Sequence, residues 1–91
     1  MTTLTLIGKS GCHLCEVAHS VVDEVLVGLP DGQADRVELV ELSILEDEAL
    51  HATWWEKIPV VLIDGEVHAQ WRVAPEALRD ALRDALAGEQ D

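Results

Sequence analysis

Cys12 and Cys15 are the two cysteines of the chain, and two residues separate them. Thiols at this C-x-x-C spacing can exchange disulfides or contribute ligands to a metal. A purely structural disulfide is the weakest interpretation, because closing so short a loop stabilises a fold by only about 2 kcal/mol in the chain-entropy model. The spacing therefore indicates redox chemistry or metal binding.

The residues around the cysteines predict that the first sulfur is held as a thiolate. Cys12 follows a glycine-containing loop and opens a predicted helix, so it should lie near free backbone N–H groups and the positive end of the helix dipole. Lys9 and His13 add positive potential, and Glu16 opposes it. We expect Glu16 to extend into water, which leaves the pKa of the Cys12 thiol below its usual value.

Cys15 lies one helical turn after Cys12 on the same face, which is the geometry of a resolving thiol. This arrangement predicts that Cys12 attacks a substrate disulfide to form a mixed disulfide. Cys15 then attacks that intermediate, which releases reduced substrate and leaves an internal disulfide.

A metal site is the alternative interpretation of the same cysteines. Cys12, Cys15 and His19 fall on one helix face, but a closed zinc site needs four ligands. His51 and His68 belong to other predicted elements and have no ligand-like spacing. We therefore expect no metal and interpret His19 as a helix surface residue.

The first half of the chain predicts a strand, a helix and a second strand. Residues 3–7 are β-branched and apolar, and the two glycines in residues 8–11 end this strand. Apolar residues recur at helical spacing over residues 12–27, and the helix stops at Gly28. Residues 36–42 are rich in Val and Leu and predict a strand parallel to the first.

The second half contains the clearest hairpin of the chain. Residues 59–63 and 66–70 flank Asp64 and Gly65, a two-residue turn that suits positive φ. These two strands should be antiparallel, whereas the first strand–helix–strand unit should be parallel.

Two further helices are predicted, one on either side of this hairpin. Residues 47–55 form a short helix of acids and alanines that carries Leu50 and Trp54 inward. The last helix begins at Pro75 and repeats Ala and Leu at i, i+4 and i+8 before Gly88. The element order is therefore βαβαββα.

This order, with C-x-x-C at a helix start and Pro59 opening the third strand, resembles the thioredoxin superfamily. The small size, without an extra N-terminal strand and helix, resembles the glutaredoxins, and in particular diverged bacterial glutaredoxin-like proteins. The resemblance covers about residues 3–87. It implies an α/β thioredoxin fold, a four-stranded mixed sheet flanked by three helices, in a single domain over residues 1–91.

The resemblance also implies roles for residues outside the dithiol. The proline matching Pro59 is cis and faces the cysteines, and the backbone of Ile58 would pair with bound substrate. The alternative is an ordinary trans proline at the first residue of a strand. Trp71 follows the hairpin on the side that faces the cysteines and is a candidate substrate contact, less so Trp55, whereas Trp54 is interpreted as core.

Departures from the family patterns bear on glutathione binding. Lys9 matches the lysine that glutaredoxins place three residues before their first cysteine. Their Gly-Gly pair and following Asp fall here on Ala69, Gln70 and Val73, so Arg72 is the candidate replacement charge for a glutathione carboxylate. Glutathione is thus a candidate reductant beside a dithiol protein, and no tightly bound cofactor is expected.

The sequence fits the thioredoxin subgroup of this superfamily less well than the glutaredoxins. Thioredoxins carry a buried acidic residue six positions before the first cysteine, and this chain has Leu6 there. His13 and Leu14 also differ from the Pro-Tyr pair that is usual in glutaredoxins. The resemblance therefore does not define a substrate beyond a protein or small-molecule disulfide.

Composition limits the partners. The net charge of −12 on 91 residues repels phosphate backbones and anionic lipid surfaces, so we expect neither a nucleic acid nor a membrane partner. We find no apolar run near the roughly 20 residues that span a bilayer, and we expect a cytoplasmic monomer. Three hypotheses remain open: a dithiol oxidoreductase, a catalytically slow peptide-binding module of the same fold, and a metal-binding chaperone.

Overall fold

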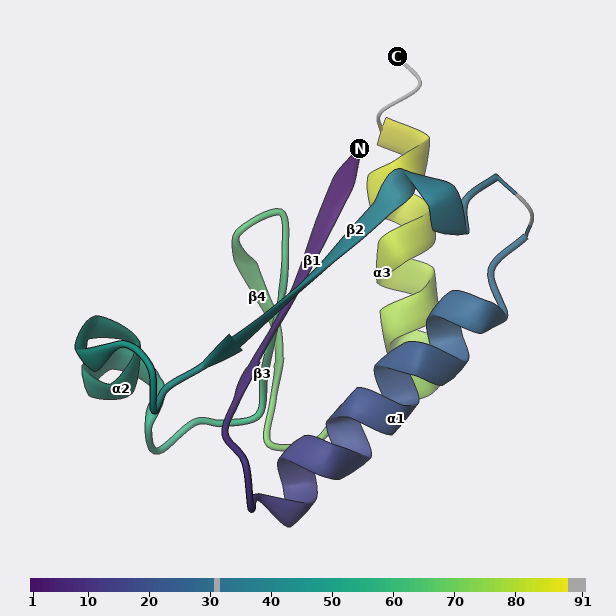
Figure 1. Ribbon diagram of the computed structural model, residues 1–91. Coiled ribbons are helices and arrows are strands. Elements are labelled where there is room, and N and C mark those ends of the chain that lie inside the picture. The colour runs from purple at the N-terminus through teal and green to yellow at the C-terminus, as the bar shows by residue number, and fades with distance from the viewer. Residues whose placement is uncertain (31, 89–91) are drawn as a thin grey trace.

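The computed structural model describes residues 1–30 and 32–88 (Figure 1). The helices and strands follow one another in the predicted order βαβαββα, and a short 3-10 helix, which the sequence analysis did not predict, precedes the second strand. Their bounds are β1 (Thr2–Gly8), α1 (His13–Val27), the 3-10 helix (Ala34–Arg36), β2 (Val37–Ser43), α2 (Glu48–Trp54), β3 (Val60–Ile63), β4 (Glu66–Gln70) and α3 (Pro75–Gly88).

The four strands form one mixed sheet in the order β2-β1-β3-β4. β1 pairs with β2 in parallel and β3 pairs antiparallel with β4, both as predicted, and β1 also pairs antiparallel with β3. Asp64 and Gly65 connect β3 to β4 with φ values of 50° and 86°, so both residues of the turn adopt the positive φ that Asp-Gly favours. The thioredoxin fold expected from the sequence is confirmed.

Alternation along the strands divides the apolar side chains between the two faces of the sheet. Leu4 and Leu6 of β1 face α1 and α3, whereas Ile7 faces the side of α2. Figure 1 shows α1 and α3 together on one side of the strands and α2 on the other.

Two clusters of buried residues follow from this division. The large cluster lies under α1 and α3 and consists of Leu4, Leu6, Ala18, Val22, Val25, Leu29, Val61, Val73, Leu78 and Leu82. The small cluster contains Ile7, Cys15, Ile44, Ile58 and Val60, with Cys12, Leu50, Trp54 and Leu62 packed against it.

The helices differ in how they are anchored. α3 buries Leu78, Leu82 and Leu86, which recur every four residues on one face, whereas α2 has no fully buried residue. Trp54, interpreted as core from the sequence, is only half-buried at the edge of the small cluster. Among the described residues, no helix is both long and apolar enough to cross a bilayer.

Candidate active site

Cys12 is the N-cap of α1, so the helix begins at His13, one residue later than predicted. The backbone of Gly11 turns with φ of 73°, which favours glycine, and Cys12 is extended with φ of −106° and ψ of 112°. The Cys12 carbonyl accepts a hydrogen bond from the Glu16 N–H at 3.1 Å, and the Cys12 Sγ accepts one from the Cys15 N–H at 3.2 Å. The Cys12 sulfur therefore takes the place of a capping oxygen at the positive end of the helix.

Cys12 and Cys15 are joined by a disulfide, with their Cα atoms 5.2 Å apart. Cys15 is 8% exposed, and Cys12 is more accessible, although still half-buried. An incoming disulfide can reach the Cys12 sulfur more readily than that of Cys15. The accessibilities thus agree with Cys12 as the attacking thiol and Cys15 as the resolving one.

Gly8 allows the end of β1 to pass directly against Cys15. A Cβ atom at Gly8 would lie 3.0 Å from the Cys15 Sγ and 3.2 Å from the Cys15 Cβ, closer than such contacts normally come. The sequence predicts Gly8 only as part of the loop that ends the strand. The structure gives it a second role, because it leaves room for the resolving sulfur.

The peptide bond between Ile58 and Pro59 is cis, as the resemblance implied. Ile58 is buried in the small cluster beside both cysteines, and Pro59 is fully buried. The segment before β3 is thereby packed against the dithiol.

Trp71 lies next to this segment. Its backbone N–H donates to the Pro59 carbonyl at 2.8 Å, and its indole Nε1–H donates to the Glu56 carbonyl at 2.9 Å. Trp71 has a φ of 64°, which is unusual for a bulky residue, and these two hydrogen bonds hold it in that conformation. Its side chain remains 53% exposed beside Pro59. A contact between Trp71 and substrate stays a prediction.

The predicted cationic residues are placed separately. His13 is the first residue of α1 and is exposed, as are Lys9 and Arg72. Arg72 lines a hollow of about 290 Å³ with Leu14 and Trp71, whereas Lys9 lines a different one. Lys9 and Arg72 therefore do not share one hollow, and their roles in binding a glutathione carboxylate stay predictions.

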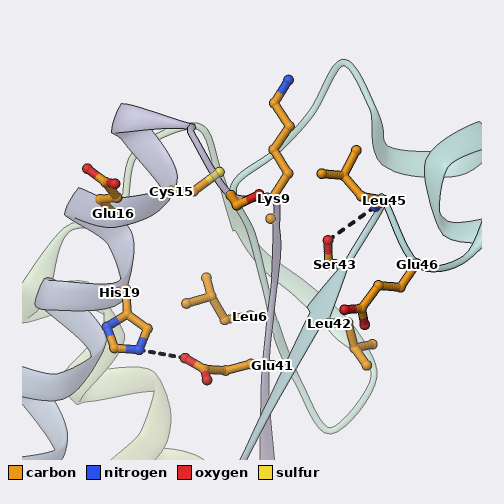
Figure 2. A pocket seen from close by; sticks show the side chains of 12 residues that line it. Leu6, Lys9, Cys15, Glu16, His19, Glu41, Leu42, Ser43, Leu45 and Glu46 are labelled. Carbon is orange, nitrogen blue, oxygen red and sulfur yellow. Dashed lines mark hydrogen bonds and ion pairs between the residues drawn. The ribbon is translucent and has the colours of Figure 1, made fainter.

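A larger hollow of about 490 Å³ opens on the side of Cys15 that faces β2. Figure 2 shows Leu6 at its centre, with α1 on one side and β2 on the other. His19 Nε2 lies 2.6 Å from Glu41 Oε1 of β2, and His19 Nδ1 lies 3.2 Å from Asp23 Oδ2 of α1. We define this hollow, lined by Leu6, Gly8, Lys9, Ser10, Cys15, Glu16, His19, Glu41, Leu42, Ser43, Leu45 and Glu46, as the rear hollow.

The contact between His19 and Glu41 was not predicted from the sequence. His19 was interpreted as a surface residue, and it is partly exposed, yet carboxylates face both of its ring nitrogens. The available signal was its position four residues after Cys15, which places both on one helix face. Within residues 1–30 and 32–88, no three His, Cys, Asp or Glu side chains are arranged to hold a metal ion.

Comparison with known protein families identifies a match over most of the chain. The model of the family described as Glutaredoxin-like domain (DUF836) matches residues 3–83 of this chain. No curated protein sequence matches the chain significantly.

Solved structures similar to this chain share its fold. A structural genomics target protein from X. campestris superimposes with a TM-score of 0.68 at 23% identity, covering 89% of this chain and 96% of that one. A mutant thioredoxin from Halobacterium salinarum superimposes with a TM-score of 0.62 at 20% identity, covering 91% of this chain and 73% of that one. The oxidized form of mitochondrial thioredoxin 3 from Saccharomyces cerevisiae superimposes with a TM-score of 0.61 at 17% identity, covering 91% of this chain and 77% of that one.

Proposed function

The chain belongs to the glutaredoxin-like domain family within the thioredoxin superfamily, and from this premise we propose that it is a thiol-disulfide oxidoreductase. The observation that carries the proposal is the disulfide between Cys12 and Cys15 at the amino end of α1. The fold, the family and the position of the dithiol together support a redox role.

Reduction of a substrate begins with the Cys12 thiolate. The Cys15 N–H and the positive end of α1 stabilise a negative charge on the Cys12 sulfur. This sulfur attacks one sulfur of the substrate disulfide, and the other substrate sulfur leaves as a thiolate and takes up a proton. A mixed disulfide between Cys12 and the substrate results.

Cys15 completes the transfer. Its thiol loses a proton, and its sulfur bonds to the Cys12 sulfur while the bond between Cys12 and the substrate breaks. Two electrons have then passed from the dithiol to the substrate, and the internal disulfide remains. A second thiol donor, either glutathione or a dithiol protein, restores the reduced form by the reverse chemistry.

We assign substrate binding to the segment of Ile58 and Pro59 and to Trp71, whose side chain is the exposed part of this group. Their placement beside the dithiol and the partial exposure of Trp71 support a role in aligning an extended peptide or a small disulfide against Cys12. An aromatic side chain of this kind gives contact area at low conformational cost.

Alkylation of Cys12 as a function of pH tests the proposal in the Cys15→Ser variant, where one thiol remains. We expect the thiolate to titrate below the range of free cysteine, since the cap and the helix end favour the charged form. A titration at or above that of free cysteine would favour the slow binding module instead.

A redox titration provides the second test. In glutathione redox buffers, the wild-type protein should convert to the internal disulfide in one transition, and Cys12→Ser and Cys15→Ser should not. Failure of the wild type to form this disulfide would refute the oxidoreductase proposal.

A further inference from the structure

Closing the internal disulfide creates a need for a proton acceptor at Cys15. Only the thiolate attacks, so the Cys15 thiol must lose its proton as the bond to Cys12 forms. Cys15 is 8% exposed, and the buried residues of its cluster, such as Ile7 and Ile58, are aliphatic and can take no proton. The inference that follows rests on the proposed function, because it concerns the second step of that reaction.

The rear hollow is the route from Cys15 to titratable groups. Its volume of about 490 Å³ far exceeds the roughly 30 Å³ that one water molecule occupies. His19 follows Cys15 by one helical turn, so the two side chains are neighbours on the same face of α1, with Cβ atoms about 5–6 Å apart. One water molecule can bridge such a gap.

The other charged groups around the hollow are less well placed. Glu16 is adjacent to Cys15 in sequence and therefore points to a different side of α1. Figure 2 shows Lys9 extending away from Leu6, and Glu46 lies beyond the end of β2. His19, with its carboxylate partners, is the group that shares the face of Cys15.

A carboxylate oxygen lies within hydrogen-bonding distance of each ring nitrogen of His19. A neutral imidazole carries one N–H and can donate to only one carboxylate, whereas the protonated ring donates from both nitrogens. His19 has Glu41 Oε1 at 2.6 Å on Nε2 and Asp23 Oδ2 at 3.2 Å on Nδ1. One added proton therefore completes both hydrogen bonds. The structure with this geometry is also the disulfide form, in which Cys15 has already given up its proton.

We propose that His19, held by Glu41, accepts the Cys15 proton through water in the rear hollow as the internal disulfide forms. The S–H bond of Cys15 breaks, its sulfur bonds to Cys12, and the substrate sulfur departs with the electron pair of the mixed disulfide bond. The proton from Cys15 completes the second hydrogen bond of His19. In this arrangement Cys15 is the nucleophile, His19 is the base and Glu41 orients the base, which is the usual way in which proteins activate a nucleophile.

Single-turnover kinetics separate this step from the first one. Reduced protein mixed with one equivalent of dithiobis(nitrobenzoate) releases one thionitrobenzoate when Cys12 attacks and a second when Cys15 closes the internal disulfide. The two phases are followed by absorbance over a range of pH for the wild type, His19→Gln and Glu41→Gln. His68→Gln is the matched control, since His68 lies on β4 and does not line the rear hollow.

In His19→Gln we expect the second phase to be about tenfold slower near neutral pH, a smaller effect than is usual for a general base because the pair is half exposed. The difference should vanish at alkaline pH, where Cys15 ionises without assistance. The first phase should be unchanged in every variant, and the control should match the wild type. Glu41→Gln should show a smaller slowing with the same pH dependence, and it leaves the sequence of α1 intact.

A second phase that is equally fast in all variants overturns the proposal. Slowing by the same factor at every pH also overturns it, because His19 and Glu41 would then only clamp α1 to β2. A wild-type protein that shows no second phase at all refutes the oxidoreductase function itself, so the two failures are distinguishable.

Discussion

The two faces of the sheet differ in how completely their helices cover them. Under α1 and α3, Leu4, Leu78 and Leu82 are fully buried. On the other face, α2 contributes Leu50 and Trp54, which are only half-buried. Each fully buried leucine stabilises the fold by roughly 2 kcal/mol relative to exposure, so the first face provides most of the stability.

The dithiol lies where these two regions meet. Cys15 belongs to α1, yet its sulfur packs into the small cluster with Ile7 and Ile58. The well-buried face holds the helix that carries the cysteines, and the less covered face keeps Cys12 within reach of a substrate. The difference indicates that stability and reactivity can be altered separately in this molecule, and each prediction below tests that separation.

The largest effect is expected in the large cluster. Leu82→Ala removes a fully buried side chain and leaves a cavity, which should lower the free energy of unfolding by about 3 kcal/mol. Urea denaturation of the reduced protein measures this change without a contribution from the disulfide. The rate of Cys12 alkylation in the folded protein should stay the same.

Leu45→Ala is the matched control for this substitution, because Leu45 is 62% exposed. Its unfolding free energy should remain within about 0.5 kcal/mol of the wild type. A large loss of Cys12 reactivity in Leu82→Ala would mean that the two regions are not separable.

Gly8→Ala tests the point where the two regions touch. The added Cβ would lie 3.0 Å from the Cys15 Sγ, so β1 or the resolving sulfur has to move. We expect a loss of about 2 kcal/mol in unfolding free energy and a slower second phase of thionitrobenzoate release.

The control for the glycine change is Gly28→Ala, at the end of α1. A Cβ there meets nothing closer than 3.4 Å and the backbone has a φ of −81°. Stability should change by less than about 1 kcal/mol, and both kinetic phases should be preserved. Unchanged closing of the internal disulfide in Gly8→Ala would show that the close approach to Cys15 is not needed.

The fold could be predicted from the sequence because its signals are local. Alternation in the strands, helical spacing of apolar residues and the turn at Asp64 and Gly65 each act over a few residues and determine an element. The position of Cys12 at a helix start was also predictable, since the glycine loop and the helical pattern adjoin it.

The rear hollow could not be predicted in this way. His19 and Glu41 are far apart in sequence and meet only because α1 returns the chain so that β2 pairs in parallel with β1. The positive φ of Trp71 was equally hidden, because it depends on hydrogen bonds to Glu56 and Pro59. Long-range contacts, rather than local pattern, determine these features.

Trp54→Ala tests the less covered face directly. Truncating a fully buried tryptophan lowers the free energy of unfolding by about 3–5 kcal/mol. Because Trp54 is only half-buried, we expect a loss of about 1.5 kcal/mol. This value includes the lost contact with Lys57 Nζ, which lies 5.7 Å from the ring centre. Trp55→Ala is the control. Because Trp55 is 55% exposed, its truncation should lower the free energy of unfolding by only about 0.5 kcal/mol. Denaturation midpoints of the reduced proteins give both values. A loss as large as that of Leu82→Ala would remove the proposed difference between the faces.

The smallest effect is expected at the start of α2. Asp47 caps this helix, and its Oδ1 accepts hydrogen bonds from the Ala49 N–H at 2.8 Å and the Leu50 N–H at 3.2 Å. Asp47→Ala should weaken α2 by about 1 kcal/mol, which is roughly a fivefold rise in local opening, and Asp47→Ser should restore most of it. Amide hydrogen exchange measures this rise in α2 while α1 serves as the internal reference. Because α2 has no fully buried residue, we expect it to open without α1; equal acceleration in both helices would show that the two faces of the sheet unfold as one unit.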